Sequence, residues 1–274
     1  MSIAPSLLRL RHRGPLPTLF KLAATRHMPS ASLSAHHFRR EVLSDRAFHS
    51  SPKISLPSPA MSPPVHSRLL CPGLNLTPAE TPSDLFASEL AFFNSIPWTA
   101  ARLSAPGAIA FVPPCRNPIT DVHDQFFGRT LANDRSLTHM LCVFRVESPE
   151  AALDPARTVT EMETLICTGD GVSGFPNVVH GGVVASLLDE SMGAFFDLNI
   201  TLGKSASAFQ ASNVTGKLDV SYLKPAPTNS VFRITVKAEE MNGRKTKFYC
   251  ELQDENGLVV AKCSSLWVTV KPSL

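Results

Sequence analysis

The chain contains no run of apolar residues approaching the ~18 that a membrane-spanning helix requires, so no membrane span is expected. It has no internal repeat either. Its 274 residues, 43% hydrophobic and 18% charged, are instead typical of a globular protein. This length accommodates one sizeable domain with extensions, or two small domains.

The six cysteines form no Cys-x-x-Cys pair and no Cys/His cluster at zinc-ligand spacing. We therefore predict no metal site and no catalytic thiol, and we expect small, mostly buried side chains in a reducing compartment. The cysteines are Cys71, Cys115, Cys142, Cys167, Cys250 and Cys263.

An excess of basic over acidic residues is confined to the N-terminus. Residues 1–48 contain eight Lys/Arg and two acidic residues, a net charge of +6, whereas residues 49–274 carry −3. The main part of the chain thus has no basic excess, and no nucleic-acid partner is expected. The leader is Arg- and Ser-rich, which is typical of a mitochondrial targeting presequence cleaved after Phe48 and predicts a matrix location. The alternative is a disordered basic tail.

Residues 49–136 are interrupted by prolines and are expected to form a linker with a helical extension. The apolar stripe between Ser83 and Ile96 predicts one helix, which Pro97 should end. Residues 98–136 are again broken by prolines, with one short helical turn expected within 121–131.

From Leu137 to about residue 272 the pattern is that of one α+β domain. Two strands, the second at 161–168, precede a long apolar helix at about 180–197, and four strands follow it. Residues apolar around nearly the whole helix circumference predict a buried helix. Asn242-Gly243 and Asn256-Gly257 predict hairpins within one antiparallel meander, and the simplest packing wraps this sheet around the helix.

The motif with chemical content begins at His180-Gly181-Gly182 and ends at Asp189. Two glycines at a helix start leave unpaired N–H groups open to a ligand, and the partial positive charge there suits a developing oxyanion. A carboxylate inside an apolar helix is costly, and service as a general base is one reason for it. Each feature also has a structural reading: close packing for the glycines, a helix cap for His180, and a surfacing helix end for Asp189.

Together with the Tyr222-Leu223-Lys224-Pro225-Ala226-Pro227 segment and the strand order, this motif resembles the hotdog-fold thioesterases of the PaaI-like, 4-hydroxybenzoyl-CoA thioesterase type. Asn242-Gly243-Arg244-Lys245 and the leader look most like the mitochondrial acyl-coenzyme A thioesterases. The resemblance implies a hotdog fold over 137–270 and hydrolysis of acyl-CoA to free acid and CoA, without metal or redox cofactor.

The resemblance also assigns residues. The Gly181 and Gly182 amides, with His180, would polarise the thioester carbonyl, and Asp189 would activate water or attack directly. A hydroxyl residue that orients the water or carboxylate matches Thr215, for which an ordinary strand threonine is the alternative. Some relatives carry a further carbonyl ligand, Asn, at the position of Gly174 in this chain, and Asn177 is the nearest amide. Lys224, Arg244 and Lys245 would meet the CoA phosphates, unless the last two are only a solvated hairpin tip.

The spacing of His180 and Asp189 bears on assembly. Nine residues on an ideal helix place them on opposite faces and about 13 Å apart along the axis. One helix therefore cannot easily direct both side chains at one thioester, whereas two copies related by a two-fold axis can. We predict a homodimer, or a dimer of dimers, with shared sites.

Two other functions compete with thioester hydrolysis. The same fold can serve as a non-catalytic module that binds acyl-CoA or a protein. A hotdog hydratase is the third candidate, but its helix would carry a further His that this helix lacks.

Overall fold

The computed structural model describes residues 67–120 and 122–270. The predicted presequence, the first part of the predicted linker and the last four residues lie outside these ranges. Among the described helices, none is long and apolar enough to span a membrane.

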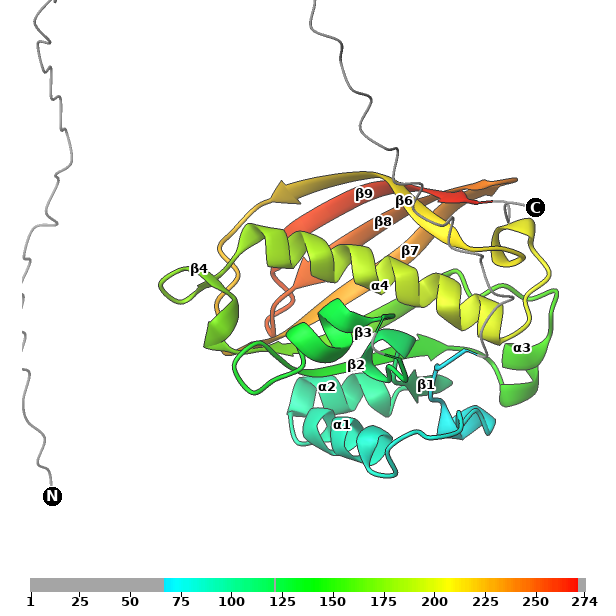
Figure 1. Cartoon of the computed structure of the whole chain (residues 1–274), viewed down its shortest axis with the longest axis horizontal. Coiled ribbons are helices and arrows are strands. Elements are labelled where there is room, and N and C mark those ends of the chain that lie inside the picture. Colours follow the sequence, from blue (N-terminus) through cyan, green and yellow to red (C-terminus); the bar gives the residue numbers. More distant parts are fainter. Residues whose placement is uncertain (1–66, 121, 271–274) are drawn as a thin grey trace, which may run out of the picture. The chain divides into compact units, whose positions relative to one another are not determined.

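The core is a seven-stranded antiparallel sheet in the order β1-β2-β3-β7-β8-β9-β6 (Figure 1). A separate hairpin pairs two short strands, β4 and β5. The strands of the sheet are β1 (Ala108–Phe111), β2 (Leu137–Arg145), β3 (Glu161–Thr168), β6 (Asn213–Tyr222), β7 (Ser230–Asn242), β8 (Lys245–Gln253) and β9 (Val259–Thr269), and the hairpin consists of β4 (Ser173–Phe175) and β5 (Val178–Val179).

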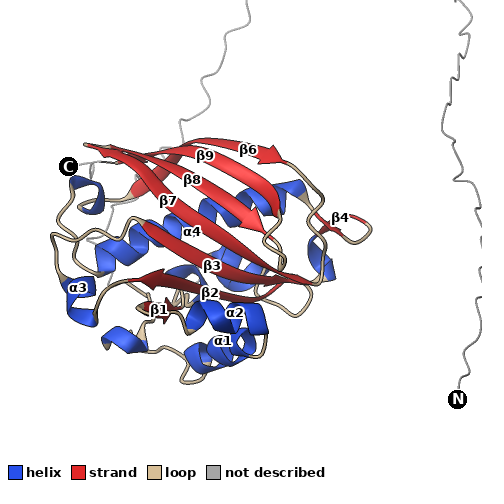
Figure 2. Ribbon diagram, turned by 180° about the vertical axis from the view of Figure 1, so that it is seen from behind, coloured by secondary structure: helices blue, strands red, loops and turns tan. Residues whose placement is uncertain are grey.

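The long helix α4 (Gly181–Thr201) lies against this sheet, which curves around it (Figures 1 and 2). Leu188, Met192 and Phe195 are fully buried between helix and sheet. The Phe195 ring meets Phe248 of β8 edge-on, with centroids 4.9 Å apart. Large apolar side chains on the inner face of the sheet thus bury the helix, and the predicted α+β hotdog fold is confirmed. The helix continues to Thr201, beyond the expected end at 197.

The strands after α4 do not form a simple meander. β6 follows the helix in sequence but pairs with β9, at the opposite side of the sheet from β3, whereas β7 pairs with β3 and β8. β6 is therefore an edge strand. Both predicted hairpins are present, and the glycine in each turn has a positive φ, +56° at Gly243 and +76° at Gly257. The first turn is one residue later than expected, because Asn242 pairs with Lys245.

Residues 67–120 and 122–136 contain more regular structure than the predicted linker. α1 (Leu85–Asn94) is the expected helix, slightly shortened. Pro97 ends it but also begins α2 (Pro97–Leu103), because proline is well suited to the first turn of a helix. β1 then adds a strand beside β2. Between α1 and the outward side chains of β2 and β3 lies a second apolar cluster of Leu70, Phe93, Val112, Leu141 and Leu165.

A buried carboxylate also fastens this segment to the sheet. Glu89 of α1 accepts the Met140 N–H at 3.0 Å and lies 3.1 Å from Nδ1 of His139. Arg116 is 4.0 Å away. Burial raises the pKa of Glu89, while His139 and Arg116 oppose this rise.

The remaining short helices are η1 (Pro72–Leu74), η2 (Pro114–Arg116), the π-helical turn η3 (Phe126–Thr130), which is the expected turn, α3 (Pro149–Leu153), η4 (Asp170–Val172) and η5 (Ser207–Phe209).

Candidate active site

His180 caps the N-terminus of α4. Its Nδ1 accepts the Gly182 N–H at 2.9 Å, and its own backbone N–H donates to the Val172 carbonyl at 2.8 Å. In the neutral imidazole an accepting Nδ1 leaves the ring proton on Nε2. His180 therefore presents an N–H donor at the helix start, in addition to its role as a cap.

Two positions beside the His180 ring have room only for glycine. A Cβ on Gly174 would lie 3.0 Å from the ring carbon Cδ2, and a Cβ on Gly182 would lie 3.0 Å from Nδ1 and 3.1 Å from Cε1. The absence of a side chain at both positions therefore leaves room for the ring, and in the described part of the chain no residue hydrogen-bonds Nε2. It also explains why this chain has Gly174 where some relatives carry Asn, since an Asn there would press on the ring.

The Gly181 N–H has no hydrogen-bond partner among the described residues. The other side of the same residue is occupied, because the hydroxyl of Tyr222 donates to the Gly181 carbonyl at 2.8 Å. We call His180, Gly181, Gly182 and Tyr222 the glycine half-site. The Gly182 N–H is engaged by His180, so Gly181 provides the available amide. From the sequence alone, Tyr222 was notable only as the first residue of the Tyr222–Pro227 motif.

Asp189 lies on α4 opposite Thr215 of β6. The Thr215 hydroxyl donates to Oδ1 of Asp189 at 2.7 Å, and we call this pair the carboxylate half-site. Leu218 and Val220 of β6 pack on the core, so strict alternation would turn Thr215 away. A bulge between Thr215 and Lys217 shifts the phase by one residue and brings Thr215 to the helix.

The two half-sites do not meet within one chain. Gly181 and Asp189 are eight residues apart on α4, or about 12 Å along its axis. Their partners Tyr222 and Thr215 occupy opposite ends of β6. Both half-sites therefore lie along the same edge strand.

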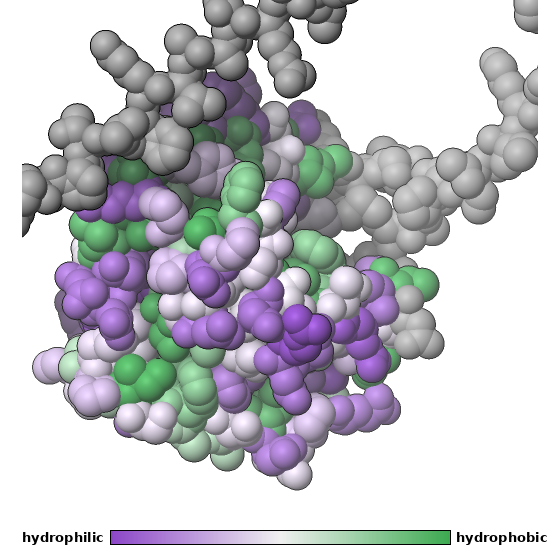
Figure 3. Space-filling view, turned by 90° about the vertical axis from the view of Figure 1, so that its left-hand side faces the viewer, coloured by the Kyte–Doolittle hydropathy of each residue, from purple (hydrophilic) through white to green (hydrophobic). Residues whose placement is uncertain are grey.

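An apolar groove of about 480 Å³ opens beside Gly181. Phe175, 77% exposed, and Leu223, 50% exposed, belong to its walls. This end of the molecule shows hydrophobic patches among hydrophilic surface (Figure 3). The other lining residues are Val178, Val179, Val184, Tyr222, Lys224, Pro225, Ala226, Leu252, Val260 and Ala261.

The predicted substrate-binding residues are spread over the molecule. Lys224 lines the groove, whereas Asn177 is exposed in the β4–β5 turn with φ +61°. Arg244 donates to the Thr269 carbonyl at 2.8 Å, at the end of β9 that pairs with the start of β6. Lys245 is beside it. Within one chain the two hairpin residues thus lie beyond the Thr215 end of β6, away from Lys224.

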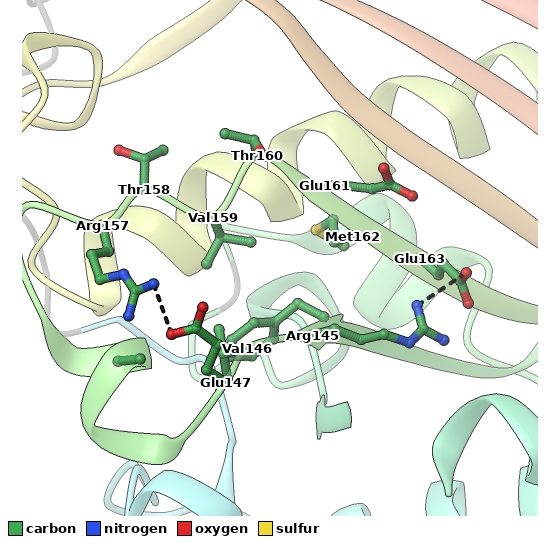
Figure 4. Close-up of a pocket in the computed structure, with 12 residues that line it drawn as sticks. Arg145, Val146, Glu147, Arg157, Thr158, Val159, Thr160, Glu161, Met162 and Glu163 are labelled. Carbon is green, nitrogen blue, oxygen red and sulfur yellow. Dashed lines mark hydrogen bonds and ion pairs between the residues drawn. The ribbon is translucent and has the colours of Figure 1, made fainter. Parts of the chain in front are cut away.

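A second cleft, of about 390 Å³, lies where β2 and β3 diverge (Figure 4). The side-chain amide of Asn199 on α4 accepts the Val159 N–H and donates to the Val159 carbonyl, which holds this segment against the helix. Ion pairs between Arg157 and Glu147 and between Arg145 and Glu163 cross the cleft. None of the predicted catalytic residues lines it.

Two acidic residues on another face of α4, Glu190 and Asp197, were not among the predicted site residues. Burial raises the pKa of Glu190 to about 7, opposed by a hydrogen bond from the Cys115 thiol. Burial likewise raises the pKa of Asp197 to about 7.

The described residues contain no group of three or more His, Cys, Asp or Glu arranged to bind a metal ion.

Comparison with known proteins matches residues 176–261 to the family model of the thioesterase superfamily. Verlamelin biosynthesis protein B from Lecanicillium sp is 24% identical over 67% of this chain and 89% of that protein. Acyl-coenzyme A thioesterase THEM4 from Xenopus laevis is 25% identical over 59% of this chain, which spans 62% of that relative. A solved hypothetical thioesterase with coenzyme A from Streptococcus pneumoniae is 16% identical, with a TM-score of 0.36 over 42% of this chain and 85% of that one.

Proposed function

This protein carries a hotdog domain of the thioesterase superfamily, and from that premise we propose that it hydrolyses acyl-CoA thioesters to a carboxylic acid and free CoA. The contact between Asp189 and Thr215 carries the proposal. It provides an oriented carboxylate on a helix made mostly of apolar residues. The name of the frog relative, an acyl-coenzyme A thioesterase, supports the substrate class.

In the proposed reaction the thioester carbonyl oxygen accepts the Gly181 N–H and the His180 Nε2–H. Asp189 removes a proton from water while the water oxygen attacks the carbonyl carbon. The tetrahedral intermediate then collapses, the C–S bond breaks, and the CoA thiolate takes up a proton. Negative charge on the carbonyl oxygen is stabilised by the helix N-terminus. In the variant mechanism Asp189 itself attacks, and water then cleaves the resulting anhydride.

We propose further that each active site combines half-sites from two copies of the chain. β6 is an edge strand of ten residues, and within residues 67–120 and 122–270 no strand pairs with its outer side; its Val214 is 48% exposed. Antiparallel pairing of two β6 strands about a point between Leu218 and Asp219 would put Tyr222 opposite Thr215 of the partner subunit. The two half-sites, separated within one chain, would then face each other.

Substrate-binding residues follow from this assembly. Lys224 at the groove would meet the negatively charged part of the substrate, and Arg244 and Lys245 would contribute from the far end of β6. Asn177, in its exposed turn, would contact substrate at the rim. The proposed location is the mitochondrial matrix, after removal of residues 1–48.

The first test is a thiol-release assay on the full chain with acyl-CoA esters of increasing length, with Asp189→Asn as the control. Hydrolysis that depends on Asp189 is expected. Folded protein that binds acyl-CoA without releasing thiol would instead establish a non-catalytic binding module. Incorporation of ¹⁸O from labelled water into Asp189 during a single turnover would identify direct attack by the carboxylate.

The shared site has a separate test in mixed variants. Asp189→Asn chains mixed with Gly181→Val chains should regain about a quarter of wild-type activity, because half of the dimers are mixed and half of their sites are intact. Mixed dimers that form but stay inactive would place each site within a single chain.

A further inference from the structure

One peptide group in the glycine half-site is hydrogen-bonded at both ends. In the peptide that joins Gly181 to Gly182, the Gly181 carbonyl accepts the Tyr222 hydroxyl at 2.8 Å. The Gly182 N–H of the same peptide donates to Nδ1 of His180 at 2.9 Å. Hydrogen bonds in such a chain polarise one another, so accepting the Tyr222 proton makes the peptide N–H a stronger donor.

This stronger donor acts on a ring that has little freedom. The ring lies so close to residues 174 and 182 that a Cβ at either position would come within 3.0 Å of it, and its Nε2 is the atom that carries the proton when Nδ1 accepts. A proton on Nδ1 would oppose the Gly182 N–H directly. The strength of that N–H therefore determines how completely His180 keeps its Nε2–H form.

Tyr222 is itself held in place. It is the last residue of β6, and the next two backbone N–H groups, of Leu223 and Lys224, both donate to the Val260 carbonyl at 2.9 and 3.1 Å. Its ring lies 3.5 Å from the position that a Cβ on Gly181 would occupy, an ordinary van der Waals distance. The hydroxyl therefore meets the Gly181 carbonyl with a fixed backbone behind it.

We propose that Tyr222 is a positioning residue for thioester hydrolysis. Its hydroxyl, acting through the Gly181–Gly182 peptide, holds His180 in the tautomer whose Nε2–H donates to the thioester carbonyl. The proposal rests on the proposed function for its catalytic consequence, but the tautomer of His180 is measurable without any activity.

The first measurement is ¹⁵N NMR of the full chain labelled at histidine, with the His180 signal identified by its loss in His180→Gln. Wild-type protein should show the Nε2–H tautomer, and Tyr222→Phe should show a mixture of both tautomers. The chain offers one matched control, since Tyr249 is its only other tyrosine and bonds Glu251 on β8. Tyr249→Phe should leave the His180 signal unchanged. An unaltered tautomer in Tyr222→Phe would overturn the proposal.

The second measurement is a double-mutant cycle. Tyr222→Phe should lower kcat about 3- to 10-fold with KM within twofold, the size of one neutral hydrogen bond. In the His180→Gln background the same change should cost less than twofold, because its target is absent. Equal losses in both backgrounds would show that the hydroxyl does not act through His180. A wild-type protein without thioesterase activity would refute the proposed function, and the NMR result would still decide the role of Tyr222.

Discussion

Asp189 and Glu190 are neighbours in sequence, but they occupy two different regions around α4. Asp189 faces the edge strand β6 and accepts the Thr215 hydroxyl. Glu190 faces the segment before the hotdog strands, where the Cys115 thiol of η2 donates to it and burial raises its pKa to about 7. Successive helical residues point 100° apart, so one helix can present two carboxylates to unlike surroundings.

This difference shows that carboxylates on one mostly apolar helix can have different roles, depending on what each of them faces. The β6 side is an open sheet edge with a hydroxyl partner, which suits a group that handles substrate. The face that carries Glu190 and Asp197 is directed towards the segment that contains Cys115, and burial raises the pKa of both acids. We therefore expect the two sides to respond differently to the same chemical change.

The largest contrast should come from removing one charge on each side. Asp189→Asn keeps the shape but loses the base, so kcat should fall by about 10²–10⁴-fold. Glu190→Gln should leave kcat within about threefold. Steady-state thioesterase assays on both variants, with circular dichroism to verify folding, make the comparison. Near-normal turnover by Asp189→Asn would remove that residue from the mechanism.

A change at the glycine half-site should have the next largest effect. The Gly181→Val side chain would block approach to the unpaired N–H and press on the Tyr222 ring, which is 3.5 Å from the Cβ position. A loss of roughly 3 kcal/mol in transition-state stabilisation is expected, the size of one oxyanion donor. Measurement of kcat and KM tests this, since a rise in KM alone would contradict an oxyanion role.

The partner of Asp189 should matter less than Asp189 itself. Thr215→Val preserves the branched shape and removes the donor, so kcat should drop about 10- to 100-fold, corresponding to one hydrogen bond to a charged group. Thr235→Val on β7 is the matched control and should retain full activity. If both variants behaved alike, Thr215 would be an ordinary strand residue.

The smallest effect should be on stability, on the face of α4 that carries Glu190. Burial raises the pKa of Glu190 from 4.5 to about 7, so the folded state binds more protons than the unfolded state between these values. Stability is then lost as pH rises through this window. Glu190→Gln should be more stable than wild type at pH 8, by about 1–3 kcal/mol, with the gain vanishing towards pH 4.5.

Urea unfolding at several pH values measures this gain. Glu239→Gln, at an exposed position on β7, supplies the response of a surface carboxylate. A Glu190→Gln gain that is the same at every pH would contradict the linkage.

Local patterns were sufficient to predict much of the fold. α4 is apolar around most of its surface, which predicts that it is buried. β3 was predicted at its observed bounds. Gly243 and Gly257 adopt the positive φ that the two predicted hairpin turns need. The resemblance assigned Asp189 and Thr215, and the structure places them 2.7 Å apart. These features depend on residues near one another in sequence or on a motif.

What the sequence by itself determined, then, was a buried helix, its strands and the chemical groups at its start and middle. Only the tertiary structure decided that β6 crosses to the sheet edge, that a bulge turns Thr215 towards Asp189, and that Tyr222 reaches the Gly181 carbonyl. It also decided that β1 and α2 form before residue 137 and that burial raises the pKa of Glu190. The physical reason is that strand pairing, bulge phase and burial are set by contacts between residues tens of positions apart, which periodicity along the chain does not record.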